Sequence, residues 1–191
     1  MANPIRKPVV ALVGRPNVGK SALFNRLAGR TISIVHDQPG VTRDRVSAPC
    51  SLTAVPCDLV DTGGIGSLDN IDFSEAVSTE AQIAMDTAEV ILFIVDAREG
   101  LTPVDQAIAQ QLRKAAAHVC LVLNKADALT PEEREEKRAI LAEESGGDVH
   151  VISGVSGEGV TDILRLVADE IAAKREEEKA EAGEEEEGWS P

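Results

Sequence analysis

A glycine-rich segment near the start of the chain carries residues suited to phosphate binding. Residues 14–21 fit the pattern GxxxxGK[ST]. The glycines let successive backbone N–H groups face phosphate oxygens, and the helix expected from Lys20 adds positive potential at its N-terminus. Lys20 can reach β- and γ-phosphates, and Ser21 offers a hydroxyl to Mg²⁺. The predicted phosphate contacts here are Gly14, Arg15, Pro16, Asn17, Val18, Gly19, Lys20, Ser21 and Ala22.

A second pattern, Asp61-Thr62-Gly63-Gly64, follows the apolar run 54–60. It places a carboxylate where a strand ends, the edge at which open α/β sheets bind ligands. Asp61 can hold Mg²⁺ through water, and the glycine pair lets the backbone approach a γ-phosphate, a contact that hydrolysis would release. Thr62, before the glycine pair, and Ile65, after it, are predicted to belong to the same phosphate-binding segment. By itself this pattern is also typical of an ordinary turn.

The segment Asn124-Lys125-Ala126-Asp127 ends another apolar run and can distinguish purine bases. Guanine offers N1–H and N2–H₂ donors where adenine offers none, so Asp127 can accept both from guanine. Adenine would leave this carboxylate without a partner, which favours guanine strongly. At the end of the last expected strand, a backbone N–H within Ser153-Gly154-Val155 is a candidate donor to the guanine O6.

The segment Arg30–Arg45 has neither helical nor strand periodicity, and loops of this length are often functional. Within it, Thr42 can offer its hydroxyl oxygen to Mg²⁺ and its backbone N–H to a γ-phosphate. An isolated threonine would carry little weight. The prediction for Thr42 depends on the other four segments occurring in the same chain and in a suitable order.

Five apolar runs alternate with five helical patterns, which predicts a mostly parallel sheet covered by helices on both faces. The strands are expected at 9–13, 54–60, 90–95, 119–123 and 149–152, and residues 46–52 are expected to add an antiparallel edge strand, making six. The helices are expected at 20–28, 73–88, 104–117, 132–144 and 160–173. This organisation predicts an N-terminal extension at 1–8, one domain at 9–173 and an acidic, disordered linker or tail at 174–191.

The composition fits one globular core, with 191 residues, 43% hydrophobic and 27% charged. The net charge of −14 disfavours a direct nucleic-acid surface, which depends on lysine and arginine. The longest apolar run, Val90–Val95, is too short to span a membrane, and no signal peptide is evident, so a cytoplasmic protein is expected. Cys50, Cys57 and Cys120 form no CxxC pair and are expected to be buried thiols.

The motifs GRPNVGKS, LFNRLAG, PGVTRDR, DTGGI and ILFIVDAREGLTPVDQAIAQQLRK resemble the first G domain of the EngA/Der family of ribosome-assembly GTPases. The resemblance covers Val9–Ala173 and implies a Ras-like P-loop fold, binding of GTP and GDP, GTP hydrolysis and a role in large-subunit assembly. That family carries two G domains and a KH-like domain, so the chain resembles an isolated N-terminal part with its linker. Ala22 and Gly154 depart from the family pattern at positions where the chemistry above requires no side chain.

Ile65 stands where Ras-like proteins carry a water-orienting glutamine, and its side chain cannot orient water. The resemblance implies instead that Asn17 helps to coordinate K⁺ beside the phosphates, together with backbone carbonyls of Pro39–Thr42. This cation would replace an arginine finger. The predicted catalytic residues are therefore Asn17, Lys20, Thr42 and Gly64.

Two other interpretations remain open at this point. In the first, the chain is a nucleotide-gated binding module with negligible turnover, which Ile65 favours. In the second, it is an ATP-dependent P-loop enzyme, against which Asn124 and Asp127 argue. Binding to the large ribosomal subunit follows from the resemblance alone, through domains outside this sequence, and no membrane partner is expected.

Overall fold

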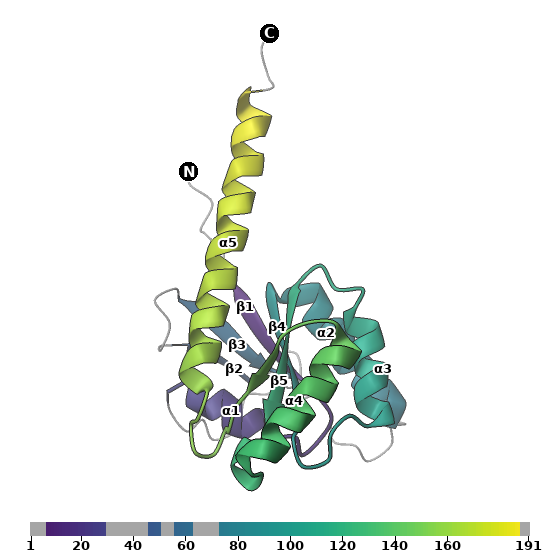
Figure 1. Ribbon diagram of the computed structural model, residues 1–191. Coiled ribbons are helices and arrows are strands. Elements are labelled where there is room, and N and C mark those ends of the chain that lie inside the picture. Colours follow the sequence, from purple (N-terminus) through teal and green to yellow (C-terminus); the bar gives the residue numbers. More distant parts are fainter. Residues whose placement is uncertain (1–6, 30–45, 51–55, 63–72, 188–191) are drawn as a thin grey trace, which may run out of the picture.

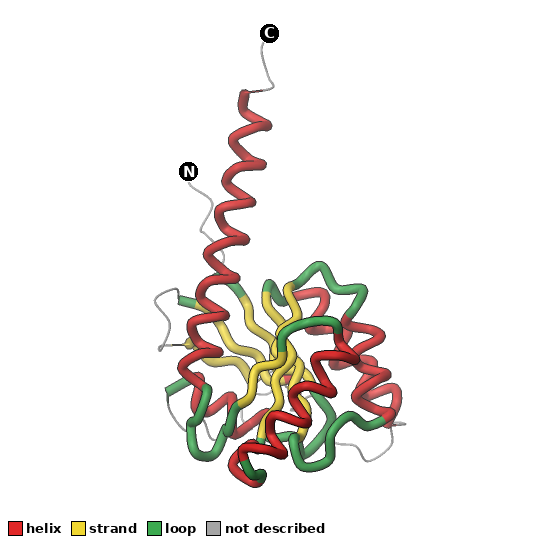
Figure 2. Tube along the Cα trace, viewed as in Figure 1, coloured by secondary structure: helices red, strands yellow, loops and turns green. Residues whose placement is uncertain are grey.

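The computed structural model describes residues 7–29, 46–50, 56–62 and 73–187 of the chain. Six strands form one sheet in the order β2-β3-β1-β4-β5-β6, drawn in yellow in Figure 2. Neighbouring strands are parallel except β2 and β3, which are antiparallel, so the predicted sheet is confirmed. The strands are β1 (Val9–Val13), β2 (Val46–Cys50), β3 (Cys57–Asp61), β4 (Val90–Asp96), β5 (His118–Asn124) and β6 (Val149–Val151).

Helices cover both faces of the sheet, which explains why the strands are apolar on both sides. One face packs against α1 and α5, and the other packs against α2, α3 and α4 (Figure 1). The central strand β4 is buried along its whole length. The helices are α1 (Lys20–Leu27), α2 (Phe73–Thr87), α3 (Pro103–Leu112), α4 (Pro131–Ser145) and α5 (Val160–Glu187), with a short 3₁₀ helix η2 (Ala126–Ala128).

Alternation along β1 divides its side chains between two hydrophobic clusters. Val10 and Leu12 belong to the cluster beneath α1 and α5, whereas Ala11 and Val13 belong to the cluster beneath α2, α3 and α4. The first cluster also receives the buried stripe of α5, whose members recur at helical spacing as the sequence predicts. These residues are Val160, Ile163, Val167 and Ile171.

Two helices begin at capping boxes. Thr102 caps α3, where its hydroxyl accepts the Asp105 N–H and the Asp105 carboxylate accepts the Thr102 N–H. Thr130 and Glu133 form the same reciprocal pair at the start of α4. Each box satisfies backbone donors that the first helical turn cannot pair, and a proline follows each threonine. Both helices begin one residue before their predicted starts at 104 and 132.

Two helix ends differ from their predicted positions. Helix α3 ends at Leu112 rather than Ala117, because the chain turns through short backbone hydrogen bonds before it enters β5 at His118. Helix α5 runs to Glu187 and projects from the body of the molecule (Figure 1). This corrects the prediction of a disordered segment for residues 174–187, which are rich in the strong helix formers glutamate, lysine and alanine.

The three cysteines are buried, as predicted. Burial, with a smaller effect of the Glu170 carboxylate, raises the pKa of the Cys120 thiol to about 12. In the described ranges, no helix is both long enough and apolar enough to cross a membrane.

The anchoring of α5 can be tested with a pair of isoleucines. Ile163, on the inner face of α5, is fully buried, whereas Ile140 on α4 is 50% exposed. Ile163→Ala should lower the free energy of unfolding by about 2–5 kcal/mol through lost burial and a cavity. Ile140→Ala should change it by less than about 0.5 kcal/mol. Urea denaturation of both variants measures these changes, and equal losses would contradict the packing described above.

Candidate functional site

The predicted functional residues gather at one edge of the sheet because the carboxyl ends of its parallel strands lie together there. The glycine-rich loop follows β1, Asp61 ends β3, and Asn124 ends β5. Ser153 comes just after β6, and Asp96 ends β4 in the middle of the sheet. Segments that are far apart in the sequence therefore meet around one site.

The glycine-rich loop wraps around the ammonium group of Lys20. This residue is the first of α1 and is 7% exposed. Its Nζ donates to the Arg15 carbonyl at 3.1 Å and also to the Gly14 carbonyl. The loop therefore surrounds a buried cation at the N-terminus of a helix, an environment that favours an anion. This geometry fits the predicted phosphate site.

Ser21 and Asp61 bring two oxygen ligands together at the predicted Mg²⁺ position. The Ser21 hydroxyl donates to Oδ2 of Asp61 at 3.0 Å, across the gap between α1 and β3. Next to it, the Thr62 hydroxyl donates to the Leu12 carbonyl at 2.8 Å and fixes the end of β3 against β1. A hydroxyl beside a carboxylate is a donor set suited to Mg²⁺, which prefers oxygen ligands. The residues present therefore fit the predicted cation.

The side chain of Asn124 ties the phosphate loop to the loop after β6. Its Nδ2 donates to the Val18 carbonyl at 2.8 Å, and its Oδ1 accepts the Gly154 N–H at 2.9 Å. Asn124 is 2% exposed, so these bonds lie in a buried setting. A Cβ atom on Gly19, whose φ is +95°, would lie 2.5 Å from Nδ2. The close packing explains why a glycine is needed at Gly19.

Lys125 makes a second connection to the phosphate loop. Its ammonium donates to Oδ2 of Asp96 at 2.6 Å and to the Asn17 carbonyl. Arg98 pairs with the same carboxylate, at 3.0 Å from its Nη2 and 3.3 Å from its Nε. The backbone at Lys125 has a φ of +66°, which turns the residue out of β5 toward these partners. One buried carboxylate thus orients two cations.

Opposing effects determine the pKa of the Asp96 carboxyl. Burial acts to raise it, but hydrogen bonds from Arg98 and Lys125 outweigh burial and lower the pKa to about 2. Because the folded-state pKa is lower than the unfolded one, the carboxylate stabilises the fold fully above a pH of about 4. That contribution is lost as the pH falls through about 2. Sequence analysis missed Asp96, although its place after a buried strand matches that of Asp61.

A pocket of about 260 Å³ opens beside these connections. It brings together most of the predicted base-binding residues, and the carboxylate-bearing Asp127 on η2 is exposed. Ser153 is fully buried instead, and its Oγ accepts the Ser156 N–H at 2.9 Å. The lining residues are Gly19, Ala22, Arg98, Asn124, Lys125, Asp127, Ala128, Gly154 and Val155.

Arg15 links the phosphate loop to α3 through contacts that the sequence pattern does not reveal. Its Nε lies 3.3 Å from Oδ2 of Asp105, and its Nη2 lies 2.9 Å from Oε2 of Glu99. Asp105 is the same fully buried carboxylate that accepts hydrogen bonds from Thr102 at the start of α3. The Arg15 side chain is thus directed to α3, which leaves its backbone for the predicted phosphate contact.

Four predicted residues lie outside the described ranges: Thr42, Gly63, Gly64 and Ile65. Their roles beside the γ-phosphate and Mg²⁺ stay predictions. The Pro39–Thr42 carbonyls predicted to complete a K⁺ site lie outside these ranges as well. Asn17 is described, and it is exposed with a φ of +67°.

Comparison with solved structures identifies the fold independently. Era from Aquifex aeolicus, in a crystal structure bound to GDP and AlF₄⁻, matches with a TM-score of 0.70 and 27% identity over 86% of this chain and 57% of that chain. The G domain of the T. maritima FeoB protein matches with a TM-score of 0.63 and 25% identity over 87% of this chain and 99% of that chain. The predicted P-loop G-domain fold is confirmed.

Sequence comparison finds similar proteins that are much longer. GTPase Der of Akkermansia muciniphila is 51% identical over 160 residues, which cover 82% of this chain and 33% of that protein. GTPase Der of Latilactobacillus sakei is 45% identical over 172 residues, which cover 90% of this chain and 38% of that protein. The matched part of the chain therefore spans about 33–38% of the length of these relatives. The predicted resemblance to the EngA/Der family is confirmed.

A family model matches the part of the chain that holds most of the site. The model is described as 50S ribosome-binding GTPase and matches residues 9–125, from the start of β1 to Lys125. The matched region contains the glycine-rich loop, Asp61, Asp96 and Asn124, and it covers more than half of the chain. The chain therefore belongs to the family of 50S ribosome-binding GTPases.

Proposed function

We propose that this chain binds GTP and GDP and hydrolyses GTP to GDP and phosphate. The observation that supports it most directly is the Asn124 bridge, because it joins a phosphate-binding loop to the pocket beside Asp127. A ligand that fills both positions must carry phosphates at one end and a base with paired donors at the other. Guanine nucleotides have this chemistry.

In the proposed reaction, the chain positions the phosphates and neutralises their charge. Lys20 places its ammonium beside the β- and γ-phosphate oxygens, and backbone N–H groups of the loop bind the phosphates. Ser21 and Asp61 would hold Mg²⁺, which neutralises charge on the same oxygens when bound. Thr42 and Gly64 are proposed to contact the γ-phosphate side of the site.

Hydrolysis also needs a group that offsets the charge developing on the transferred phosphoryl group. The Ile65 side chain has no polar atom for this purpose or for orienting water. We propose that Asn17 helps to hold a K⁺ ion beside the phosphates. Its backbone is already fixed, because Lys125 donates to its carbonyl and its φ is +67°. Na⁺ is smaller and would hold the same ligands at poorer distances.

GTP turnover in two salts tests the proposed activity. With Mg²⁺ present, the rate in KCl should exceed the rate in NaCl at equal ionic strength by at least about 10-fold, because a correctly placed cation lowers the barrier. Asn17→Ala should abolish this difference while GDP binding persists. Asn17→Gly should do the same without backbone strain, since glycine accepts a positive φ.

The salt experiment distinguishes a K⁺-stimulated GTPase from a nucleotide-gated binding module. Equal rates in both salts would contradict the K⁺ mechanism. Negligible turnover in both salts, with GDP still bound, would favour a nucleotide-gated binding module, the second candidate that Ile65 supports. Loss of GDP binding in Asn17→Gly would contradict a role for Asn17 in catalysis alone.

Base selection by Asp127 can be tested by replacing its carboxylate with an amide. Asp127→Asn should weaken GDP binding by at least about 10-fold, because the carboxylate that accepts two donors is lost. The same variant should bind xanthosine diphosphate more tightly than the original chain, since its amide can donate to the xanthine O2. Fluorescence competition measures both affinities.

A matched control for that exchange is Asp162→Asn, which removes one carboxylate from the exposed start of α5. It should leave both affinities unchanged. If Asp127→Asn also left them unchanged, Asp127 would not contact the base.

We further propose that the chain acts in the cytoplasm in assembly of the large ribosomal subunit. The family description and the similarity to GTPase Der support this role. Contacts with the ribosome would come from parts of a longer protein, because the net charge of −14 disfavours direct RNA binding by this chain.

A further inference from the structure

The loop after β6 forms a closed turn with two distinct sides. The Ser153 N–H donates to the Glu158 carbonyl at 3.0 Å, and the Gly157 N–H donates to the Ser153 carbonyl at 2.8 Å. On one side of this turn, Gly154 and Val155 line the pocket of about 260 Å³ that is proposed to hold the base, here called the base pocket. On its other side, the turn meets a single charged side chain from α1.

That side chain is Arg26. Its Nε donates to the Gly154 carbonyl at 2.9 Å, and its Nη2 donates to the Val155 carbonyl. The guanidinium also packs against Gly157, where an added Cβ atom would lie 2.5 Å from Nη1 and the φ is +91°. The turn is therefore built around the Arg26 guanidinium, and it needs a glycine at Gly157 to admit it.

The Arg26 contacts determine which way the neighbouring N–H groups face. In a trans peptide the C=O and the following N–H point in opposite directions. Holding the Gly154 carbonyl toward α1 therefore turns the Val155 N–H away from α1, toward the pocket that Val155 lines. The Gly154 N–H is fixed as well, since it donates to Asn124 at 2.9 Å. A charged donor on a carbonyl also strengthens the N–H of the same peptide unit.

We propose that Arg26 is a positioning residue for recognition of the guanine O6, through its hydrogen bonds to the Gly154 and Val155 carbonyls. This inference rests on the proposed binding of guanine nucleotides. Arg26 does not touch the base; it orients backbone donors that do. Asp127 reads a different edge, the N1–H and N2–H₂ donors, so the two recognition elements can be separated with suitable analogues.

Three diphosphates provide that separation. GDP offers both the O6 acceptor and the N1–H and N2–H₂ donors. Inosine diphosphate keeps O6 but lacks the 2-amino group. The third ligand, 6-thioguanosine diphosphate, keeps the donors but replaces O6 with sulfur, a weak acceptor. Arg26→Gln should weaken GDP and inosine diphosphate by about 10-fold each, as expected for lost charge-assisted hydrogen bonds. It should weaken 6-thioguanosine diphosphate by less than about twofold, since that ligand gains little from the oriented N–H groups. Titration calorimetry measures all three affinities.

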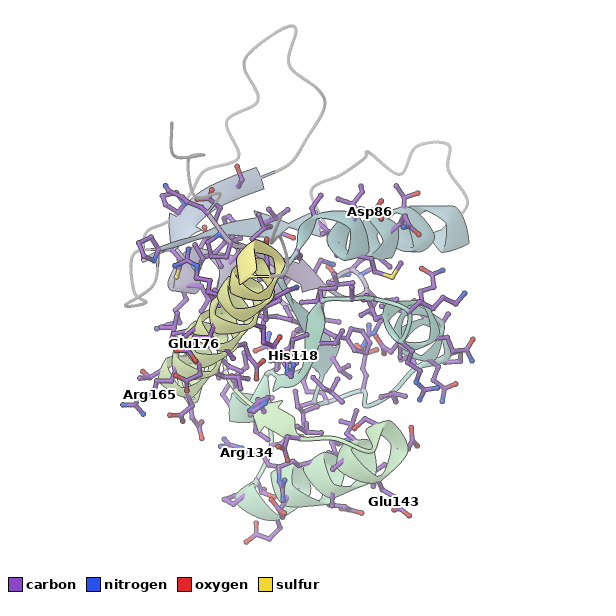
Figure 3. All side chains as sticks on the ribbon, turned by 90° about the horizontal axis from the view of Figure 1, so that it is seen from above. Asp86, His118, Arg134, Glu143, Arg165 and Glu176 are labelled. Atoms are coloured by element: carbon purple, nitrogen blue, oxygen red, sulfur yellow. The ribbon has the colours of Figure 1, made fainter. Side chains whose placement is uncertain are left out.

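Two further variants serve as control and confirmation. Arg165→Gln removes an arginine that is 74% exposed on α5 and points away from the body (Figure 3), and it should leave all three affinities unchanged. Gly157→Ala keeps Arg26 but places a methyl group against its guanidinium, and it should reproduce the selective loss of GDP and inosine diphosphate.

Equal weakening of all three ligands by Arg26→Gln would overturn the inference, because it would indicate general loosening of the site. Unchanged affinities in Arg26→Gln would also overturn it. Failure of the original chain to bind GDP would instead refute the proposed function itself, and the inference with it.

Discussion

The Asn124 side chain imposes the constraint on which the rest of the site depends. One buried amide donates to the phosphate loop and accepts from the loop after β6, so neither loop can move without breaking a buried hydrogen bond. An unpaired polar group in such a place costs about 1–3 kcal/mol. The distance between the phosphate end and the base end of the site is therefore set before any ligand arrives. Gly19 must lack a side chain because the amide occupies the space that a Cβ atom would need.

Ion pairs fix the orientation of the charged side chains around the Asn124 amide. Asp96 is fully buried, and it is kept ionised by Lys125 and Arg98, which both line the base pocket. Asp105 has a comparable role, because it joins Arg15 of the phosphate loop to the start of α3. Cations near the site are thus oriented by carboxylates at the ends of strands and helices. Such pre-orientation lowers the cost of ordering side chains when a polyanionic ligand binds.

Local patterns account for the parts of the fold and site that could be predicted from sequence. The apolar runs revealed the sheet because strands buried on both faces have a continuous hydrophobic signal. The helical patterns at 104–117 and 132–144 located two helix starts to within one residue, and capping boxes at Thr102 and Thr130 fix these starts through side-chain chemistry confined to four residues. The assignment of Asn124 and Asp127 to base binding rests on their short spacing at the end of a strand, and it stays a prediction.

Other features depend on tertiary contacts and gave no comparable signal. Asp96 and Asp105 resemble ordinary acidic residues until the fold brings Lys125 and Arg15 to them. The hydrogen bond from Arg26 to the Gly154 carbonyl, in the loop after β6, joins residues 128 positions apart. Residues 174–187 continue α5 without an apolar stripe to mark the helix in the sequence, although glutamate, lysine and alanine have high helix propensity.

The central claim is that one preformed edge of this sheet binds a guanine nucleotide. Titration calorimetry of the purified chain with GDP and with ADP, in Mg²⁺, tests it most directly. The account predicts that GDP binds at least about 10⁴-fold more tightly than ADP, because adenine would leave the Asp127 carboxylate without its donors. Equal affinities for the two nucleotides, or binding of neither, would contradict it.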